Sequence, residues 1–293
     1  MDQEGLAMCD KDIHPGLIED WSLTRRTFVA TGIVAAGLAS SAYAAENVVE
    51  KDVTVKTADG SADAALFHPP GKGSWPAVLI WPDIMGLRPV FREIGRRLAA
   101  QGYVVLVPNP FYRSKKAPVV EGNVDFSNAE VRQALFGYRA AMTDAGVATD
   151  AVAYLAFLDQ QPETAKGKKA GVQGYCMGGP LSFMTAAAVP GRIGAVGSFH
   201  GGGLVTDQPD SPHLLIPRTR AAYLVAVAKN DDAREPEAKN VLKAAFKAAN
   251  RPATVEVYPA DHGWCVPGSQ VYDQAAAERA WAALTTLYKT NLV

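Results

Sequence analysis

The sequence has little cysteine, no excess of basic residues and no internal repeat. Its three cysteines are too few for a disulfide framework, and no group of cysteines and histidines has zinc-finger spacing. Lysine and arginine together number 29, against 30 acidic residues, so a nucleic-acid backbone would meet no basic surface. About half of the residues are apolar, which is typical of a globular protein. We therefore expect neither a metal site nor nucleic-acid binding.

The N-terminal segment has the pattern of a twin-arginine export signal. Arg25 and Arg26 precede a weakly apolar stretch rich in alanine and glycine, and the small-residue cleavage motif "AYA" ends at Ala44. We expect residues 1–44 to be a leader read by the export machinery, and residues 45–293 to be a single domain in the periplasm. Two alternatives stay open: an amphipathic extension, and an uncleaved anchor whose apolar stretch is barely long enough to span a bilayer.

Beyond the leader, short apolar runs alternate with longer amphipathic patterns. An Asp59-Gly60 turn divides an alternating segment into two strands of a predicted hairpin. Continuous apolar runs without alternation are typical of strands that are buried on both faces. The later runs of this kind are "PAVLIWP", "YVVLVPN", "KKAGVQG", "RIGAVGSFHG", "AAYLVAVAK" and "ATVEVYP". The sequence therefore predicts an α/β fold, with a mostly parallel central sheet and helices on both of its faces.

The segment "VQGYCMGGP" places a cysteine in the pattern G-x-C-x-G between a predicted strand and a predicted helix. Gly174 and Gly178 flank Cys176 at the spacing of a nucleophile elbow, a sharp turn that needs small neighbours because other backbone passes close by. The turn also places the sulfur at a helix N-terminus, which favours a thiolate. The alternative is a buried cysteine that only fills space in the core.

An acid and a histidine follow the cysteine in the order that a nucleophile elbow requires. Asp231 and Asp232 come directly after one predicted strand, and His262 lies in the loop after the next. The pattern does not decide between the two adjacent aspartates. His200, in "SFHGGGL", lies after the nucleophile and not before it, so we interpret it as part of the pocket wall or as scaffolding and not as an oxyanion motif.

The stretches "GYCMGG", "KNDD" and "DHGW" together resemble the dienelactone hydrolase family of α/β-hydrolases, over roughly residues 50 to 290. The resemblance implies an α/β-hydrolase fold in which Cys176 is the nucleophile, His262 the general base and Asp231 the acid that orients it. Asp232 stays the alternative acid.

Further positions are assigned by the same resemblance. The backbone N–H groups of Ile84 and Met177 correspond to the oxyanion-hole donors, and Asp83 stands where prototypical members carry a glutamate that tunes the thiol. Arg113 matches an arginine that helps to hold a substrate carboxylate. The second arginine of that kind corresponds here to Val266, so the chain departs from the family in its expected anion clamp.

These assignments predict hydrolysis of a small-molecule ester or lactone, similar to a dienelactone, through a thioester on Cys176 and without metal or organic cofactor. A neutral carboxylic ester is the alternative substrate. Two other classes stay open: a thiol-redox protein in which Cys176 pairs with Cys265, and a non-catalytic binding protein on the same scaffold. The sequence makes no prediction of the oligomeric state.

Overall fold

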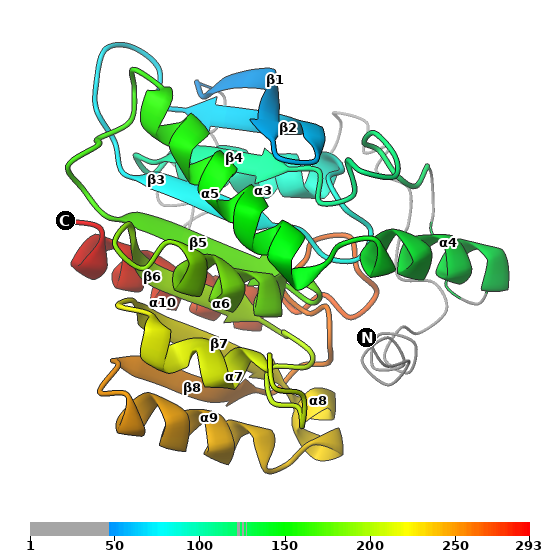
Figure 1. Cartoon of the computed structure of the whole chain (residues 1–293). Coiled ribbons are helices and arrows are strands. Elements are labelled where there is room, and N and C mark those ends of the chain that lie inside the picture. The colour runs from blue at the N-terminus through cyan, green and yellow to red at the C-terminus, as the bar shows by residue number, and fades with distance from the viewer. Residues whose placement is uncertain (1–46, 122–123, 125, 127) are drawn as a thin grey trace, which may run out of the picture.

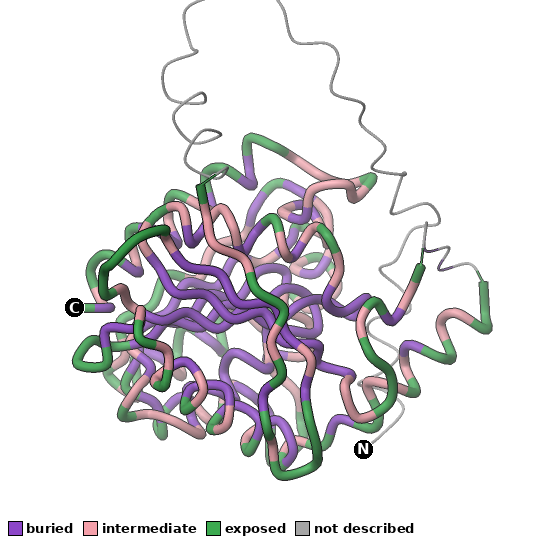
Figure 2. Tube along the Cα trace, turned by 90° about the horizontal axis from the view of Figure 1, so that it is seen from above, coloured by how far each residue is buried: buried purple, intermediate pink, exposed green. Residues whose placement is uncertain are grey.

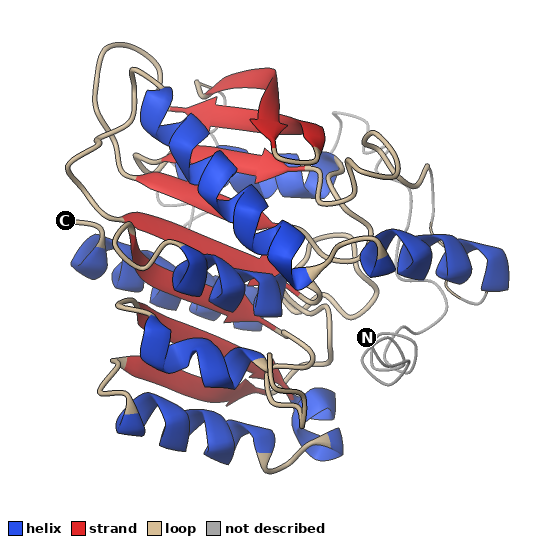
Figure 3. Cartoon of the chain, viewed as in Figure 1, coloured by secondary structure: helices blue, strands red, loops and turns tan. Residues whose placement is uncertain are grey.

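In the computed structural model, residues 47–121, 124, 126 and 128–293 are described, so the leader predicted for residues 1–44 lies outside the described residues. The described strands form one eight-stranded sheet in the order β1-β2-β4-β3-β5-β6-β7-β8 (Figures 1 and 3). The strands are β1 (Val49–Thr57), β2 (Gly60–His68), β3 (Ala77–Trp81), β4 (Val104–Pro108), β5 (Ala170–Tyr175), β6 (Ile193–Phe199), β7 (Ala222–Ala228) and β8 (Ala253–Tyr258).

The sheet is parallel except at one side. The predicted hairpin pairs β1 with β2 around the turn between Thr57 and Gly60, and β2 runs antiparallel to β4. Each remaining neighbouring pair, from β4 and β3 through to β7 and β8, is parallel. The prediction of a mostly parallel sheet is confirmed, and its physical basis is visible in β3, β4 and β5, where all residues are buried.

Helices cover both faces of the sheet (Figure 1). One face carries α5 (Asp144–Gln160), α6 (Gly178–Ala188) and α9 (Ala238–Ala248), and the other carries α3 (Pro89–Ala99) and α10 (Gln274–Asn291). The helices bury apolar side chains at helical spacing; in α3 these are Phe91, Ile94 and Leu98. Two cores result, one on each face, and the strands between them form the buried centre of Figure 2.

Some helices were not predicted from the sequence. Helix α4 (Ala129–Ala140) is capped by Asn128, whose side chain accepts hydrogen bonds from the N–H groups of Glu130 and Val131. That cap was a usable signal, but only Leu135 of the helix is buried, so its apolar pattern is weak. The short helices α7 (Pro212–Leu215) and η1 (Ile216–Arg218) were missed too, and α8 (Lys229–Arg234) begins directly after β7.

The parallel strands all end at the same edge of the sheet, where α4 and α8 also lie (Figure 1). The loops after β5, β6, β7 and β8 therefore meet there. No helix in the described ranges is long and apolar enough to cross a membrane.

Candidate active site

Cys176 lies in a strained turn between β5 and α6. Its φ is +52°, a left-handed conformation that residues other than glycine rarely adopt. A Cβ on Gly174 would lie 1.8 Å from the carbonyl oxygen of Gly178, and a Cβ on Gly178 would lie 2.3 Å from the carbonyl oxygen of Trp81. The two glycines are thus required because backbone passes on both sides of the turn. This is the geometry of a nucleophile elbow.

His262 and Asp231 form a hydrogen-bonded pair at the ends of neighbouring strands. The His262 Nδ1 atom lies 2.8 Å from Oδ2 of Asp231, which is in α8 directly after β7. The backbone N–H of His262 donates to the side-chain oxygen of Asn230, 2.8 Å away, and fixes the loop after β8. Oδ1 of Asp231 accepts from Arg234, 2.8 Å away. The carboxylate is thus held in place and orients the imidazole.

Asp232 points to a different partner. Its Oδ1 atom accepts a hydrogen bond from Nζ of Lys239, 2.6 Å away. Of the two adjacent aspartates, Asp231 is therefore the one bound to His262. The sequence did not separate them, because only the turn of α8 decides which carboxylate faces the histidine.

His200 is the neighbour of His262 in the site. It follows β6, and the centroids of the two imidazole rings lie 4.7 Å apart. Tyr175 and Trp264 also lie around its ring, with centroids 6.2 and 6.3 Å away. His200 is 1% exposed, which agrees with the interpretation of a wall residue.

The backbone N–H groups of Ile84 and Met177 are available for an oxyanion. Within the described part of the chain, no hydrogen bond uses either group, and both residues are buried. The loop that carries Ile84 follows β3 and lies against the elbow, because the space beside Gly178 is filled by the carbonyl oxygens of Trp81 and Pro82. Their position agrees with the predicted roles, which stay predictions.

Asp83 forms an ion pair that sequence reasoning missed. Its two carboxylate oxygens accept from both terminal nitrogens of Arg88, at 2.6 and 2.8 Å, and Oδ1 also accepts from the N–H of Met85. The guanidinium of Arg88 lies over the ring of Phe91. The carboxylate thus has a cationic partner of its own, and its predicted role in tuning the thiol stays a prediction.

Neither of the two described cysteines, Cys176 and Cys265, forms a disulfide. Cys176 belongs to the core on the α5 and α6 face, whereas Cys265 packs against the core on the α3 and α10 face. Burial raises the pKa of Cys265 well above its ordinary value, which makes it a poor nucleophile. Val266 is buried in the same core. An apolar side chain thus stands where the family resemblance places the second arginine.

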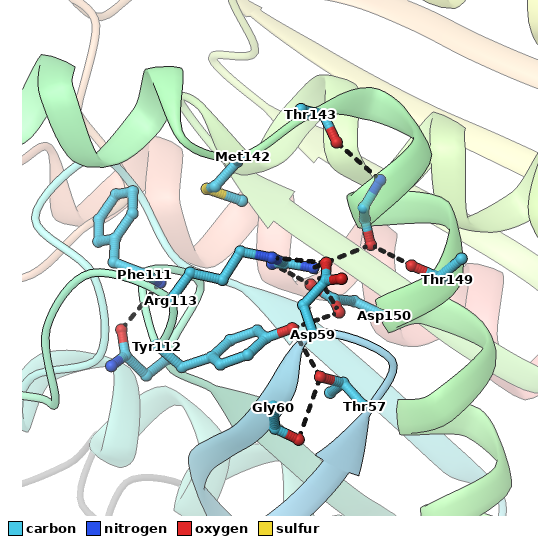
Figure 4. A network of polar contacts seen from close by, with 12 residues as sticks. Thr57, Asp59, Gly60, Phe111, Tyr112, Arg113, Met142, Thr143, Thr149 and Asp150 are labelled. Carbon is cyan, nitrogen blue, oxygen red and sulfur yellow. Dashed lines mark hydrogen bonds and ion pairs between the residues drawn. The ribbon is translucent and has the colours of Figure 1, made fainter.

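Arg113 is bound to carboxylates of the protein itself (Figure 4). Its guanidinium donates to both oxygens of the buried Asp150, at 2.7 and 2.9 Å, and to Oδ2 of Asp59 in the β1–β2 turn. The ring of Tyr112 lies beneath it, and the hydroxyl of Tyr112 donates to Asp150. Burial acts to lower the pKa of Arg113, but its hydrogen bonds to Asp150 and Asp59 outweigh burial and raise it. The predicted role in binding a substrate carboxylate stays a prediction, and this geometry gives it no support.

The carboxyl edge of the sheet therefore carries Cys176 after β5, His200 after β6, Asp231 after β7 and His262 after β8. Asn230 and Arg234 support His262 and Asp231, Arg88 pairs with Asp83, and none of these three supporting residues was singled out from the sequence. Among the described residues, no group of three or more histidine, cysteine, aspartate or glutamate side chains is placed to hold a metal ion.

The fold and this arrangement define the class as α/β-hydrolase. A model of the dienelactone hydrolase family matches residues 62–292, so the chain belongs to that family. It is 27% identical over 224 residues to carboxymethylenebutenolidase 1 of Cupriavidus pinatubonensis, covering 76% of this chain and 90% of that protein.

Solved structures agree on the fold. A dienelactone hydrolase-like promiscuous phosphotriesterase from metagenomic libraries superposes with a TM-score of 0.69 at 23% identity, over 84% of this chain and 100% of that chain. Dienelactone hydrolase from Anabaena variabilis superposes with a TM-score of 0.62 at 18% identity, with the same coverage of both chains.

Proposed function

We propose that the protein hydrolyses a carboxylic ester or lactone through a covalent thioester on Cys176. The observation that carries the proposal is the strained elbow cysteine on the sheet edge that also holds the His262–Asp231 pair. Membership of the dienelactone hydrolase family supports a hydrolase, and the carboxymethylenebutenolidase relatives support an ester or lactone substrate.

The steps follow from the chemistry of these groups. His262 accepts the proton of the thiol, and the sulfur of Cys176 attacks the substrate carbonyl to form a C–S bond. The N–H groups of Ile84 and Met177 donate to the resulting oxyanion, a contribution that is typically worth about 10²–10³ in rate. His262 then gives the proton to the leaving oxygen as the ester bond breaks. Water, activated by His262, hydrolyses the thioester and releases the acid.

The same residues favour a substrate without a carboxylate. A bidentate anion clamp needs guanidinium groups with unengaged donors. Here Arg113 is bound to Asp59 and Asp150, and Val266 occupies the position of the second arginine. We therefore infer that neutral esters or lactones are turned over faster than an anionic dienelactone, which stays the second candidate because of the family relatives.

The test is hydrolysis of neutral p-nitrophenyl esters and of an anionic dienelactone by the reduced protein and by its Cys176→Ala variant. Loss of activity in the variant is the expected result. Unchanged hydrolysis in Cys176→Ala would show that the sulfur is not the nucleophile. A dienelactone rate above the neutral-ester rate would refute the inferred substrate preference.

We also propose that the protein is exported, on the support of the Arg25-Arg26 motif and the cleavage motif that ends at Ala44. An Arg25→Lys, Arg26→Lys variant should stay in the cytoplasm in cell fractionation, whereas the unaltered chain should be found in the periplasm and begin at Ala45.

A further inference from the structure

His200 is at the centre of the site and takes no part in the mechanism above. It follows β6, the strand between β5, which leads to the nucleophile, and β7, which leads to Asp231. Its backbone N–H donates to the carbonyl oxygen of Ala226, 2.8 Å away, and its φ is +39°. A histidine held in this strained conformation between the nucleophile and the acid calls for a physical explanation.

The imidazole of His200 is buried without hydrogen bonds. Neither ring nitrogen has a hydrogen-bond partner within the described residues, although a neutral imidazole carries one donor and one acceptor. Buried polar atoms are nearly always paired, because water no longer compensates them. A purely structural role would be served better by an apolar ring at this position.

The surroundings of the His200 ring favour its neutral form. Burial first, and the neighbouring His262 second, hold the pKa of His200 well below its ordinary value. Two imidazolium rings with centroids 4.7 Å apart would repel each other. Of the two rings, only that of His262 has a carboxylate partner among the described residues, Asp231.

We propose that His200 is a positioning residue for His262: its neutral ring packs against His262 and stabilises the imidazolium that forms when His262 accepts the thiol proton. The inference rests on the proposed function. Before proton transfer the His200 ring has no hydrogen-bond partner among the described residues. Once His262 is protonated, the His200 ring offers its π face and a nitrogen lone pair to the positive charge on His262. An interaction that is stronger in the charged transition state than in the ground state accelerates the reaction. An interaction of equal strength in both states does not.

Other charged or titratable groups also surround the pair. Asp231 faces His262 from α8 and is bound in turn by Arg234. Asp261, the residue before His262, lies 3.5 Å from Nζ of Lys229. Tyr175, at the end of β5, packs its ring against His200 with centroids 6.2 Å apart, and Cys176 is the next residue in the chain. Only His200 changes in the test below, so the contributions of these groups cancel in the comparison.

The test compares the unaltered, reduced protein with the variants His200→Phe and His200→Asn. Phenylalanine keeps an aromatic ring but removes both nitrogens. Asparagine keeps a hydrogen-bond acceptor and tolerates a positive φ. The readout is the rate of alkylation of Cys176 by iodoacetamide as a function of pH, followed by mass spectrometry of the peptide, together with kcat and KM for a neutral ester.

In His200→Phe the thiolate loses part of its imidazolium partner, so the alkylation midpoint should move to higher pH by roughly one unit, a tenfold change in the ionisation equilibrium. We expect kcat to fall roughly tenfold with KM nearly unchanged, since His200 is almost fully buried and acts through His262. His200→Asn should stay closer to the unaltered protein in both readouts. If His200→Phe shows no cooperative unfolding transition, His200→Leu takes its place as the variant without polar atoms.

An unchanged midpoint in the apolar variant overturns the proposal. So does the reverse order, with His200→Asn affected more than His200→Phe, because ring packing alone would then explain the position. The alkylation readout needs no turnover. A shifted alkylation midpoint in a protein that hydrolyses no ester would therefore refute the proposed function and leave the positioning role of His200 standing. Ester hydrolysis with an unshifted midpoint would support the proposed function and refute the positioning role.

Discussion

Asp231→Asn should lower kcat/KM for a neutral ester by roughly 10²–10⁴-fold with little effect on folding. The carboxylate accepts the Nδ1–H of His262 through Oδ2, 2.8 Å away, and so leaves Nε2 free to accept the thiol proton. An asparagine can turn its NH₂ group toward Nδ1 instead. The imidazole then carries its proton on Nε2 and no longer acts as the base. A serine nucleophile in this geometry loses about 10⁴-fold, and we expect a smaller loss here because a thiol ionises more readily than a hydroxyl.

The cost in stability should be small. The Asp231→Asn variant would lose the charge of the contact with Arg234, whose side chain is 29% exposed, and screened pairs of this kind contribute up to about 1 kcal/mol. A urea unfolding curve on each variant separates this effect from the loss of rate. A transition midpoint close to that of the unaltered protein is the expected result.

Asp232→Asn is the matched control, since it removes the same charge one residue away. Its carboxylate binds Lys239 and not the histidine, so we expect kcat/KM within about twofold of the unaltered protein. The reasoning would be refuted if Asp231→Asn kept full activity, or if Asp232→Asn lost more activity than Asp231→Asn.

Three further predictions concern packing, ion pairing and thiol reactivity. Gly174→Ala should lower the free energy of unfolding by about 3 kcal/mol or more, because the added Cβ would overlap a backbone oxygen. Gly137→Ala has open space around it in exposed α4 and should raise the free energy of unfolding by about 0.5–1 kcal/mol. Urea unfolding of both variants checks this, and equal effects would contradict the crowding argument. Arg113→Ala should cost about 3–5 kcal/mol of stability, because the buried carboxylate of Asp150 would lose its cationic partner, and kcat for neutral esters should be unchanged. A stable variant with a raised KM for an anionic lactone would instead assign Arg113 to the substrate. Cys265 should react with iodoacetamide far more slowly than Cys176 at about pH 7, because burial raises the pKa of Cys265 and its thiolate forms only at higher pH. Equal rates by peptide mass spectrometry would refute this prediction.

Most of the fold was predictable because local patterns agree with the tertiary arrangement. The apolar runs from residue 77 onward became parallel strands, largely buried except for the edge strand β8, and the Asp59-Gly60 turn joins β1 to β2. Helix α4 was missed because it buries only Leu135 and so shows little apolar periodicity. Its start at Asn128 is a local signal that pattern reading gave too little weight.

The candidate site was predictable in residue type and order but not in pairing. G-x-C-x-G followed by an aspartate and a histidine after later strands singled out Cys176 and His262 as candidates. Both aspartates after β7 fitted the pattern equally well, and Arg113 matched its family position while its guanidinium is bound to other carboxylates.

The sequence by itself determined the strands, the helices with a clear apolar face and the glycine-flanked turn, because these depend on side chains close together along the chain. The tertiary structure alone decided that Asp231, and not Asp232, binds His262 and that the ring of His200 packs against His262. These contacts join residues from different elements, or depend on the turn of one helix. Their partners are therefore set by how the loops meet at the edge of the folded sheet, which no local pattern records.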